Sequence, residues 1–173
     1  LVINALPVVS VNDSTICAGD PGALFTASSD SLSTSYEWNG TPGTDSTITG
    51  TVAGNYAVMV TDKNGCTGRD TGLLVINALP ILSVNDSTIC TGATGGALFT
   101  ASSDSLSTSY EWNGVAGSDS TIIGTTAGEY RVLVTDTNGC QGRDTGLLVL
   151  SALPVISVND SSICVGDPAA LFT

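Results

Sequence analysis

Apolar and polar residues alternate in short runs along the whole chain. Valine, isoleucine, threonine and tyrosine cluster in runs that end at Asn-Gly, Pro-Gly or Asn-Asp pairs, and no helical period of apolar residues is sustained. In the first part of the chain this pattern predicts strands at residues 8–11, 23–28, 35–38, 47–51, 56–61 and 73–76. Residues 62–65, Asp-Lys-Asn-Gly, predict a tight turn between the last two strands. Six or seven short strands of this kind are typical of a small Greek-key β-sandwich.

The chain contains internal repeats, so this strand pattern occurs more than once. Residues 23–40 read ALFTASSDSLSTSYEWNG, and residues 97–114 repeat every letter. The phrase LPVVSVNDSTIC recurs with small changes twice further along the chain. We predict the end of a preceding repeat at residues 1–6, full repeats at residues 7–79 and 80–153, and the first strands of a truncated third repeat at residues 154–173. Because both ends lie inside a repeat, we expect a segment of a longer polypeptide.

The link between the two full repeats has no flexible spacer. Residues 75–80, Val-Ile-Asn-Ala-Leu-Pro, pass from the last predicted strand of one repeat to the first strand of the next without a run of glycine or serine. Pro80 stiffens this link, which predicts a rod of repeats with a fixed angle between neighbours. The expected partners are further repeats of the same chain, and identical chains associated laterally in a fibre.

Charge and composition narrow the function. The 173 residues include 16 acidic and 4 basic side chains and no histidine, for a net charge of −12. Such a charge repels phosphate backbones and anionic lipids, which argues against nucleic-acid binding and against a role at a membrane surface. Histidine is the usual general base near neutral pH, and the single lysine, Lys63, falls in a predicted turn, so we expect no enzyme. No apolar run reaches the length of a membrane-spanning helix, and the chain opens in mid-phrase without a signal peptide.

The cysteines follow the repeat. Each full repeat has one cysteine before its second predicted strand and one directly after the turn that precedes its last predicted strand. This spacing predicts disulfides Cys17–Cys66 and Cys90–Cys140, with Cys164 bonded to a partner beyond the chain end. Closing a loop of about 50 residues would stabilise such a small sandwich by about 4 kcal/mol in the chain-entropy model. Disulfides place the chain in an oxidising, extracellular compartment. The alternative is a set of free buried thiols.

Several motifs fall in the same order in both repeats and resemble a known family. Ile16-Cys17 is followed by Tyr36-Glu37-Trp38, and then by a Gly-x-Tyr-x-Val-x-Val-Thr-Asp-x-Asn-Gly-Cys phrase that starts at Gly54. This sequence is similar to PKD/immunoglobulin-like repeats, which occur in large surface adhesins and secreted proteins of gliding bacteria that use the type IX secretion route. The resemblance implies an all-β fold of tandem β-sandwich repeats of about 73–74 residues, joined end to end. It also implies core positions of the tryptophan and tyrosine-corner type at Trp38, Trp112, Tyr56 and Tyr130.

The same resemblance sets the functional expectation. It favours a structural or adhesive extracellular filament, a rigid disulfide-bonded rod that projects from the cell surface towards surface glycans or a host or substrate surface. The alternative is a set of carbohydrate-binding or spacer repeats in a secreted multidomain hydrolase. In that case Trp38 and Trp112 would form a sugar-stacking platform, although their strand positions favour the core.

A recurring tripeptide, Asp-Ser followed by threonine or leucine, resembles the O-glycosylation acceptor that the same bacterial group uses on exported proteins. The candidate acceptors are Ser14, Ser31, Ser46, Ser87, Ser105 and Ser120. The third copy, Asp160-Ser161-Ser162, departs from the pattern. The alternative is that Asp-Ser pairs simply form turns.

Two further groups of residues are candidates for binding. Asp62 and Asp136 open Asp-x-Asn-Gly, as a calcium loop does, but the later acidic ligand of that loop is absent. We therefore expect plain turns and no cofactor, with calcium as the alternative. Four apolar side chains have the parity of the outer face and form a candidate lateral contact: Leu24, Leu98, Met59 and Leu133.

Overall fold

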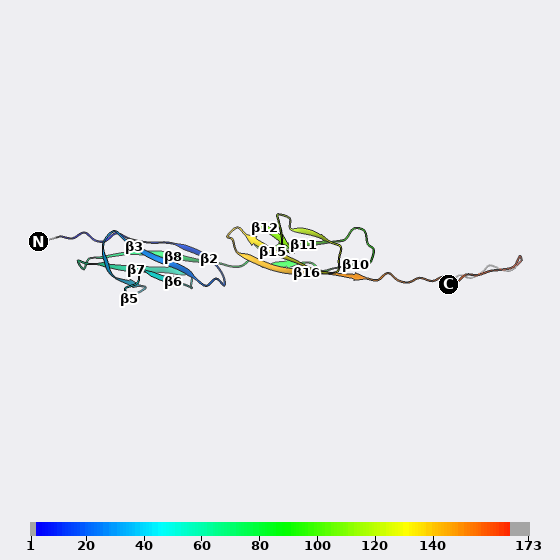
Figure 1. Cartoon of the computed structure of the whole chain (residues 1–173), viewed down its shortest axis with the longest axis horizontal. Coiled ribbons are helices and arrows are strands. Elements are labelled where there is room, and N and C mark those ends of the chain that lie inside the picture. Colours follow the sequence, from blue (N-terminus) through cyan, green and yellow to red (C-terminus); the bar gives the residue numbers. More distant parts are fainter. Residues whose placement is uncertain (1–2, 167–173) are drawn as a thin grey trace.

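The computed structural model describes residues 3–166, which form two elongated β-bodies arranged end to end (Figure 1). The first body contains β1 (Val9–Val11), β2 (Ser14–Cys17), β3 (Ala23–Ser29), β4 (Ser33–Trp38), β5 (Thr41–Gly43), β6 (Thr47–Gly50), β7 (Gly54–Asp62) and β8 (Thr67–Asn77). The second contains β9 (Leu82–Val84), β10 (Ser87–Cys90), β11 (Ala97–Ser103), β12 (Ser107–Trp112), β13 (Val115–Gly117), β14 (Thr121–Gly124), β15 (Gly128–Asp136) and β16 (Gln141–Ser151). Within the described residues, no helix is long and apolar enough to cross a membrane.

Each body is a sandwich of two sheets. In the first, one sheet has the order β1-β3-β6 and the other the order β2-β8-β7-β4-β5. The second body repeats both orders with the corresponding strands, β9-β11-β14 and β10-β16-β15-β12-β13. All pairings are antiparallel except β2 with β8 and β10 with β16, which are parallel. The chain is therefore a tandem array of immunoglobulin-like β-sandwiches, as the sequence predicts.

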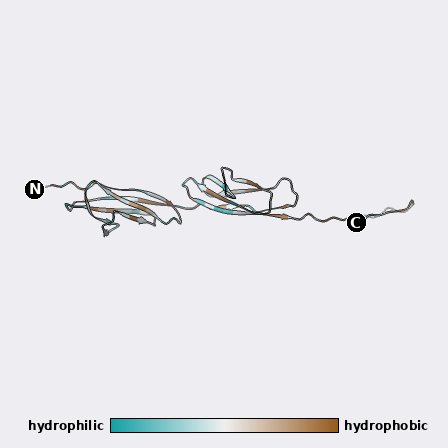
Figure 2. Ribbon diagram, in the orientation of Figure 1, coloured by the Kyte–Doolittle hydropathy of each residue, from teal (hydrophilic) through white to brown (hydrophobic). Residues whose placement is uncertain are grey.

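The core of each sandwich lies between its two sheets. Figure 2 shows hydrophobic segments along the strands of both bodies. In the first, Phe25 on β3 packs with Trp38, Val58 and Leu74 from the opposite sheet. Trp38 is 6% exposed, and its indole Nε1 donates a hydrogen bond to the Asp45 carbonyl at 3.1 Å. Trp112 is equally buried in the second body and makes the same bond to Asp119. Both tryptophans are thus core residues.

Tyr56 ties β7 to the loop that precedes it. Its hydroxyl donates to the Val52 carbonyl at 2.9 Å, and its ring stacks on Phe25 with centroids 4.5 Å apart. Gly50 lies against this ring pair, where a Cβ would come within 2.6 Å of the tyrosine ring. Tyr130 repeats the arrangement and donates to the Thr126 carbonyl at 3.1 Å. This geometry is that of a tyrosine corner.

The expected third repeat differs from its counterparts. Residues 154–164 carry nearly the sequence of β9 and β10 but form no strand and are exposed. In the full repeats, β9 and β10 are strands because they pair with β11 and β16 of their own sandwich. Residues 1–2 and 167–173, which belong to the predicted end pieces 1–6 and 154–173, lie outside the described residues.

Candidate functional site: the junction between repeats

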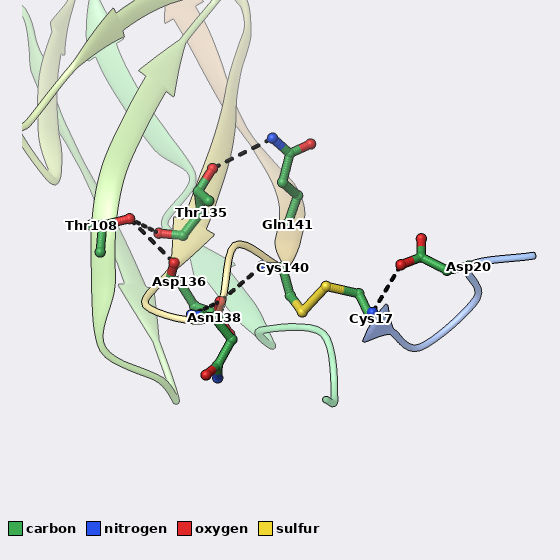
Figure 3. The surroundings of a disulfide bond; sticks show 8 residues. All are labelled: Cys17, Asp20, Thr108, Thr135, Asp136, Asn138, Cys140 and Gln141. Atoms are coloured by element: carbon green, nitrogen blue, oxygen red, sulfur yellow. Dashed lines mark hydrogen bonds between the residues drawn. A yellow bond between two sulfur atoms is a disulfide. The ribbon is translucent and has the colours of Figure 1, made fainter. Parts of the chain in front are cut away.

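Cys17 lies at the tip of the first sandwich. It is the last residue of β2 and is aligned with Asn77, the last residue of β8. The amide of Ala18 donates to the Asn77 carbonyl at 2.8 Å, which extends the pairing by one residue. The chain then turns at Gly19, where φ is +93°, and Asp20 Oδ2 accepts from the Cys17 amide at 2.8 Å. This turn holds the Cys17 side chain at the end of the sandwich that faces the second repeat (Figure 3).

Cys140 lies at the near end of the second sandwich, directly after the turn between β15 and β16. The turn is organised by Asp136, whose Oδ1 accepts from the amides of Asn138 at 2.8 Å and Cys140 at 2.9 Å. Asp62 makes the same two bonds in the first repeat, to the amides of Asn64 and Cys66. Both aspartates are 4% exposed, so these weak calcium candidates serve the turn itself. Among residues 3–166, no three acidic or cysteine side chains are grouped to hold a metal ion.

A disulfide joins Cys17 to Cys140 and therefore joins one repeat to the next (Figure 3). Their Cα atoms are 5.6 Å apart although 123 positions separate them in sequence. The predicted pairings Cys17–Cys66 and Cys90–Cys140 are wrong. Cys66 immediately precedes β8, whereas Cys17 aligns with the far end of that 11-residue strand. At roughly 3.3 Å per residue the two cysteines of one repeat are about 35 Å apart, far beyond the reach of a disulfide.

The peptide link is a second connection beside the disulfide. It leaves the first sandwich at Asn77, the residue aligned with Cys17. It enters the second at Pro80, which is buried. The Pro80 carbonyl lies so close to Gly142 that a Cβ there would be 2.3 Å away, and Gly142 is only two residues beyond Cys140. Two covalent connections thus cross the junction side by side, and together they oppose twisting and bending of one sandwich against the other.

The bridged cysteines are more buried than their repeat counterparts. Cys140 is 1% exposed, whereas Cys66, at the same position in the first repeat, is half-buried. Cys17 is half-buried, whereas Cys90, its counterpart in the second repeat, is exposed. Within the described residues Cys66 and Cys90 have free thiols. Cys164, predicted to bond beyond the chain end, lies in the exposed segment after β16.

The structure gives the Asp-Ser pattern a local role in folding. Asp13 Oδ1 accepts from the Leu73 amide and Asp30 Oδ1 accepts from the Val8 amide, both at 2.8 Å. Asp86 and Asp104 make the corresponding bonds in the second repeat. The six candidate acceptor serines are all half-buried: Ser14, Ser31, Ser46, Ser87, Ser105 and Ser120. Their glycosylation stays a prediction.

The four candidate lateral-contact residues do not come together on one face. Leu24 and Leu98 are 59% and 58% exposed, on β3 and β11 of the three-stranded sheets. Met59 and Leu133 are half-buried, on β7 and β15 of the opposite sheets. Arg69 covers Met59, with Nη2 donating to the thioether sulfur at 3.2 Å. A lateral contact would therefore use one pair or the other.

Comparisons with known proteins give matches among solved structures. No family model matches the chain, and no curated protein does. Solved structures that match include Sidekick-1 immunoglobulin domains 1-4 (16% identity, TM-score 0.43, 84% of this chain and 48% of that chain). They also include extracellular domains 3-5 of Drosophila OTK (16%, 0.46, 82% and 60%) and the titin I9-I11 tandem (14%, 0.44, 87% and 69%). The chain spans about half the length of the Sidekick-1 structure. At such identities the likeness concerns the fold alone.

Proposed function

We propose that this chain is a segment of an extracellular structural or adhesive filament, in which the repeats form a stiff rod and carry out no catalysis. The observation that carries the proposal is the position of the disulfide between Cys17 and Cys140. A bridge between the two sheets of one sandwich would stabilise that sandwich. A bridge between neighbouring sandwiches instead fixes their mutual orientation, which matters for a protein whose task is to extend.

The junction supports stiffness in a second way. A single flexible peptide link would let two sandwiches reorient freely. Here the link from Asn77 to Pro80 is short, begins in a strand and ends at a buried proline.

The net charge of −12 adds repulsion between neighbouring rods, which favours solubility over non-specific association.

The setting of this filament is proposed on chemical grounds. A disulfide is typical of proteins in an oxidising compartment, which supports an extracellular location. The resemblance to PKD/immunoglobulin-like repeats supports a cell-surface adhesin of the kind that gliding bacteria export. Its partners would be further repeats of the same chain and, at a distal tip, surface glycans or a host or substrate surface. O-linked sugars on the Asp-Ser serines would belong to the same setting.

The carbohydrate-binding alternative loses its main support. Trp38 and Trp112 are 6% exposed and give their indole N–H groups to backbone carbonyls, so their faces are not presented to a sugar. Spacer repeats in a secreted hydrolase remain a version of the same mechanical role, since a spacer also holds two parts at a fixed distance.

Removal of the bridge tests the proposal. In the Cys17→Ser/Cys140→Ser variant we expect sandwiches with unchanged far-UV circular dichroism but a junction free to bend. Small-angle X-ray scattering should then show a broader distribution of maximum dimensions than the oxidised protein. Within this 173-residue chain Cys66 and Cys90 have free thiols, so Cys66→Ser/Cys90→Ser in the same chain is the matched control: it removes the same number of cysteines and leaves the bridge intact. Equal distributions for the two variants would contradict a stiffening role for the bridge.

A further inference from the structure

Cys66 and Cys90 share the backbone arrangement of a bridged cysteine, although Ala93 stands beside Cys90 where Asp20 accepts from the Cys17 amide. The Asp62 carboxylate accepts from the Cys66 amide at 2.8 Å, as Asp136 does for Cys140. Cys90 ends β10 opposite Ser151, and the following amide, that of Thr91, donates to the Ser151 carbonyl at 2.8 Å, as at Cys17. The N-terminal end of the two-repeat array therefore presents Cys66, in the position that Cys140 occupies in the junction. The C-terminal end presents Cys90, in the position that Cys17 occupies.

We propose that Cys66 and Cys90 form this same bridge with the repeats that adjoin them in the polypeptide. Cys90 would bond to the second cysteine of the following repeat, and Cys66 to the first cysteine of the preceding one. The sequence on both sides supports neighbouring repeats as the bonding partners. Residues 1–7 repeat residues 74–80 letter for letter, and residues 153–164 restart the phrase that leads to Cys17 and Cys90. The inference rests on the proposed function, since it extends one junction to every junction of the rod.

The burial of the cysteines also supports the adjoining repeats as the bonding partners. Cys140 and Cys17 gain their extra burial from the neighbouring sandwich and from each other, while Cys66 and Cys90 retain the exposure of an open junction. The bridge forms when the two thiols lose two protons and two electrons to the disulfide of a thiol oxidoreductase, which is reduced to its dithiol. No other co-reactant is needed.

This pairing scheme produces two staggered covalent routes along the rod. From Cys140 the first route follows β16 through the second sandwich (Figure 1) and then residues 152–163 to Cys164, the first cysteine of the following repeat. The other route would pass from Cys66 along β8, across the link, and along β9 and β10 to Cys90. In the second sandwich both routes run side by side, because β10 and β16 are adjacent parallel strands.

Both routes are already nearly extended in the folded protein. β16 contains 11 residues in strand conformation, which rises by about 3.3 Å per residue against a limit of about 3.6 Å. Tension along the rod would therefore pass through extended strands and disulfides. Residues 18–65 and 91–139 would lie outside both stretched paths, so the rest of each sandwich would stay folded under load.

Disulfide mapping of the native, non-reduced protein tests the pairing. Trypsin cleaves after Lys63, Arg69, Arg131 and Arg143, which places each of the five cysteines in its own peptide. After alkylation of free thiols, we expect the Cys90 peptide linked to a peptide from the second-cysteine turn of the next repeat. Linkage of Cys17 to Cys66 would overturn both this inference and the proposed function. An intact Cys17–Cys140 bridge with alkylated Cys66 and Cys90 would overturn this inference alone.

Stretching single native molecules tests the mechanical consequence. Without reductant we expect rupture with no stepwise unfolding of sandwiches. With reductant, each repeat of about 73 residues should extend to roughly 250 Å, a gain of about 210 Å over the roughly 40 Å that it spans when folded. Stepwise unfolding of the fully oxidised protein would overturn the staggered routes.

Discussion

The two repeats have the same interior and different outer surfaces. Their buried core clusters consist of seven residues of the same type in the same order: Ala23, Phe25, Ala27, Trp38, Val58, Val60 and Leu74 in the first, and Ala97, Phe99, Ala101, Trp112, Val132, Val134 and Leu148 in the second. The turn aspartates that position the second cysteines are also the same. The constant residues are therefore those that set the shape of a sandwich and hold its second cysteine, which in the second repeat connects it to the preceding one.

Some of the differences lie on the outer face of the five-stranded sheets. In the first repeat a shallow depression of about 260 Å³ is bordered by Ala57, Met59 and Arg69. In the second, Arg131 and Leu133 replace the alanine and the methionine, and the depression measures about 550 Å³. Neither change reaches the core or the junction. The comparison teaches that the outer face can vary between repeats without altering the rod.

Truncation of the central phenylalanine tests the equality of the interiors and should have the largest effect. Phe25→Ala and Phe99→Ala each remove a fully buried ring that stacks on a tyrosine, so each should lower the free energy of unfolding by about 3–5 kcal/mol. Hydrogen exchange measured by mass spectrometry locates the loss in the mutated repeat. A clear difference between the two variants would show that the repeats do not share one core.

The tyrosine corner offers a smaller test of the same equality. Tyr56→Phe and Tyr130→Phe keep the ring stack but remove hydroxyls that donate at 2.9 Å and 3.1 Å. Each substitution should cost about 1 kcal/mol, the typical net contribution of one hydrogen bond. Urea unfolding of the two variants beside the parent protein measures this cost. A loss as large as that of the phenylalanine variants would mean that the hydroxyl holds the whole loop before β7.

The strand pattern and the core were predictable because alternation and repetition are local signals. Trp38 and Tyr56 could be placed from their neighbours along one strand. β5 was missed because Thr41–Gly43 contains a proline and is fully exposed, so only its pairing with β4 makes it a strand. β2 was missed because it is an edge strand of four residues whose partner, β8, lies far along the chain.

The disulfide could not be predicted because it depends on where the ends of strands fall in space. The sequence predicts the last strand of the first repeat only at residues 73–76, whereas β8 spans Thr67–Asn77. Its first half contains glycines, an arginine and an aspartate, which give no apolar alternation. The glycine at position 72 is explained by the structure, because a Cβ there would be 2.3 Å from the Asn12 carbonyl. A last strand limited to the predicted residues 73–76 would allow Cys66 to lie near Cys17. The full-length β8 instead places the two cysteines at opposite ends of the sandwich.

The ion pair of the second repeat provides the smallest test, directed at the outer face. Arg131 bonds Glu129 two residues earlier on β15, and the two side chains are 72% and 54% exposed. Exposed pairs of this kind contribute about 0–1 kcal/mol, so Arg131→Ala should leave the urea midpoint almost unchanged. The reciprocal variant, Asn55→Glu/Ala57→Arg, places the same pair on β7 of the first repeat and should be equally neutral, since those positions are also exposed. A loss of more than about 1 kcal/mol in either variant would show that the outer face contributes to the stability of the sandwich. In that event the two repeats would differ in how they fold as well as in what they present to solvent.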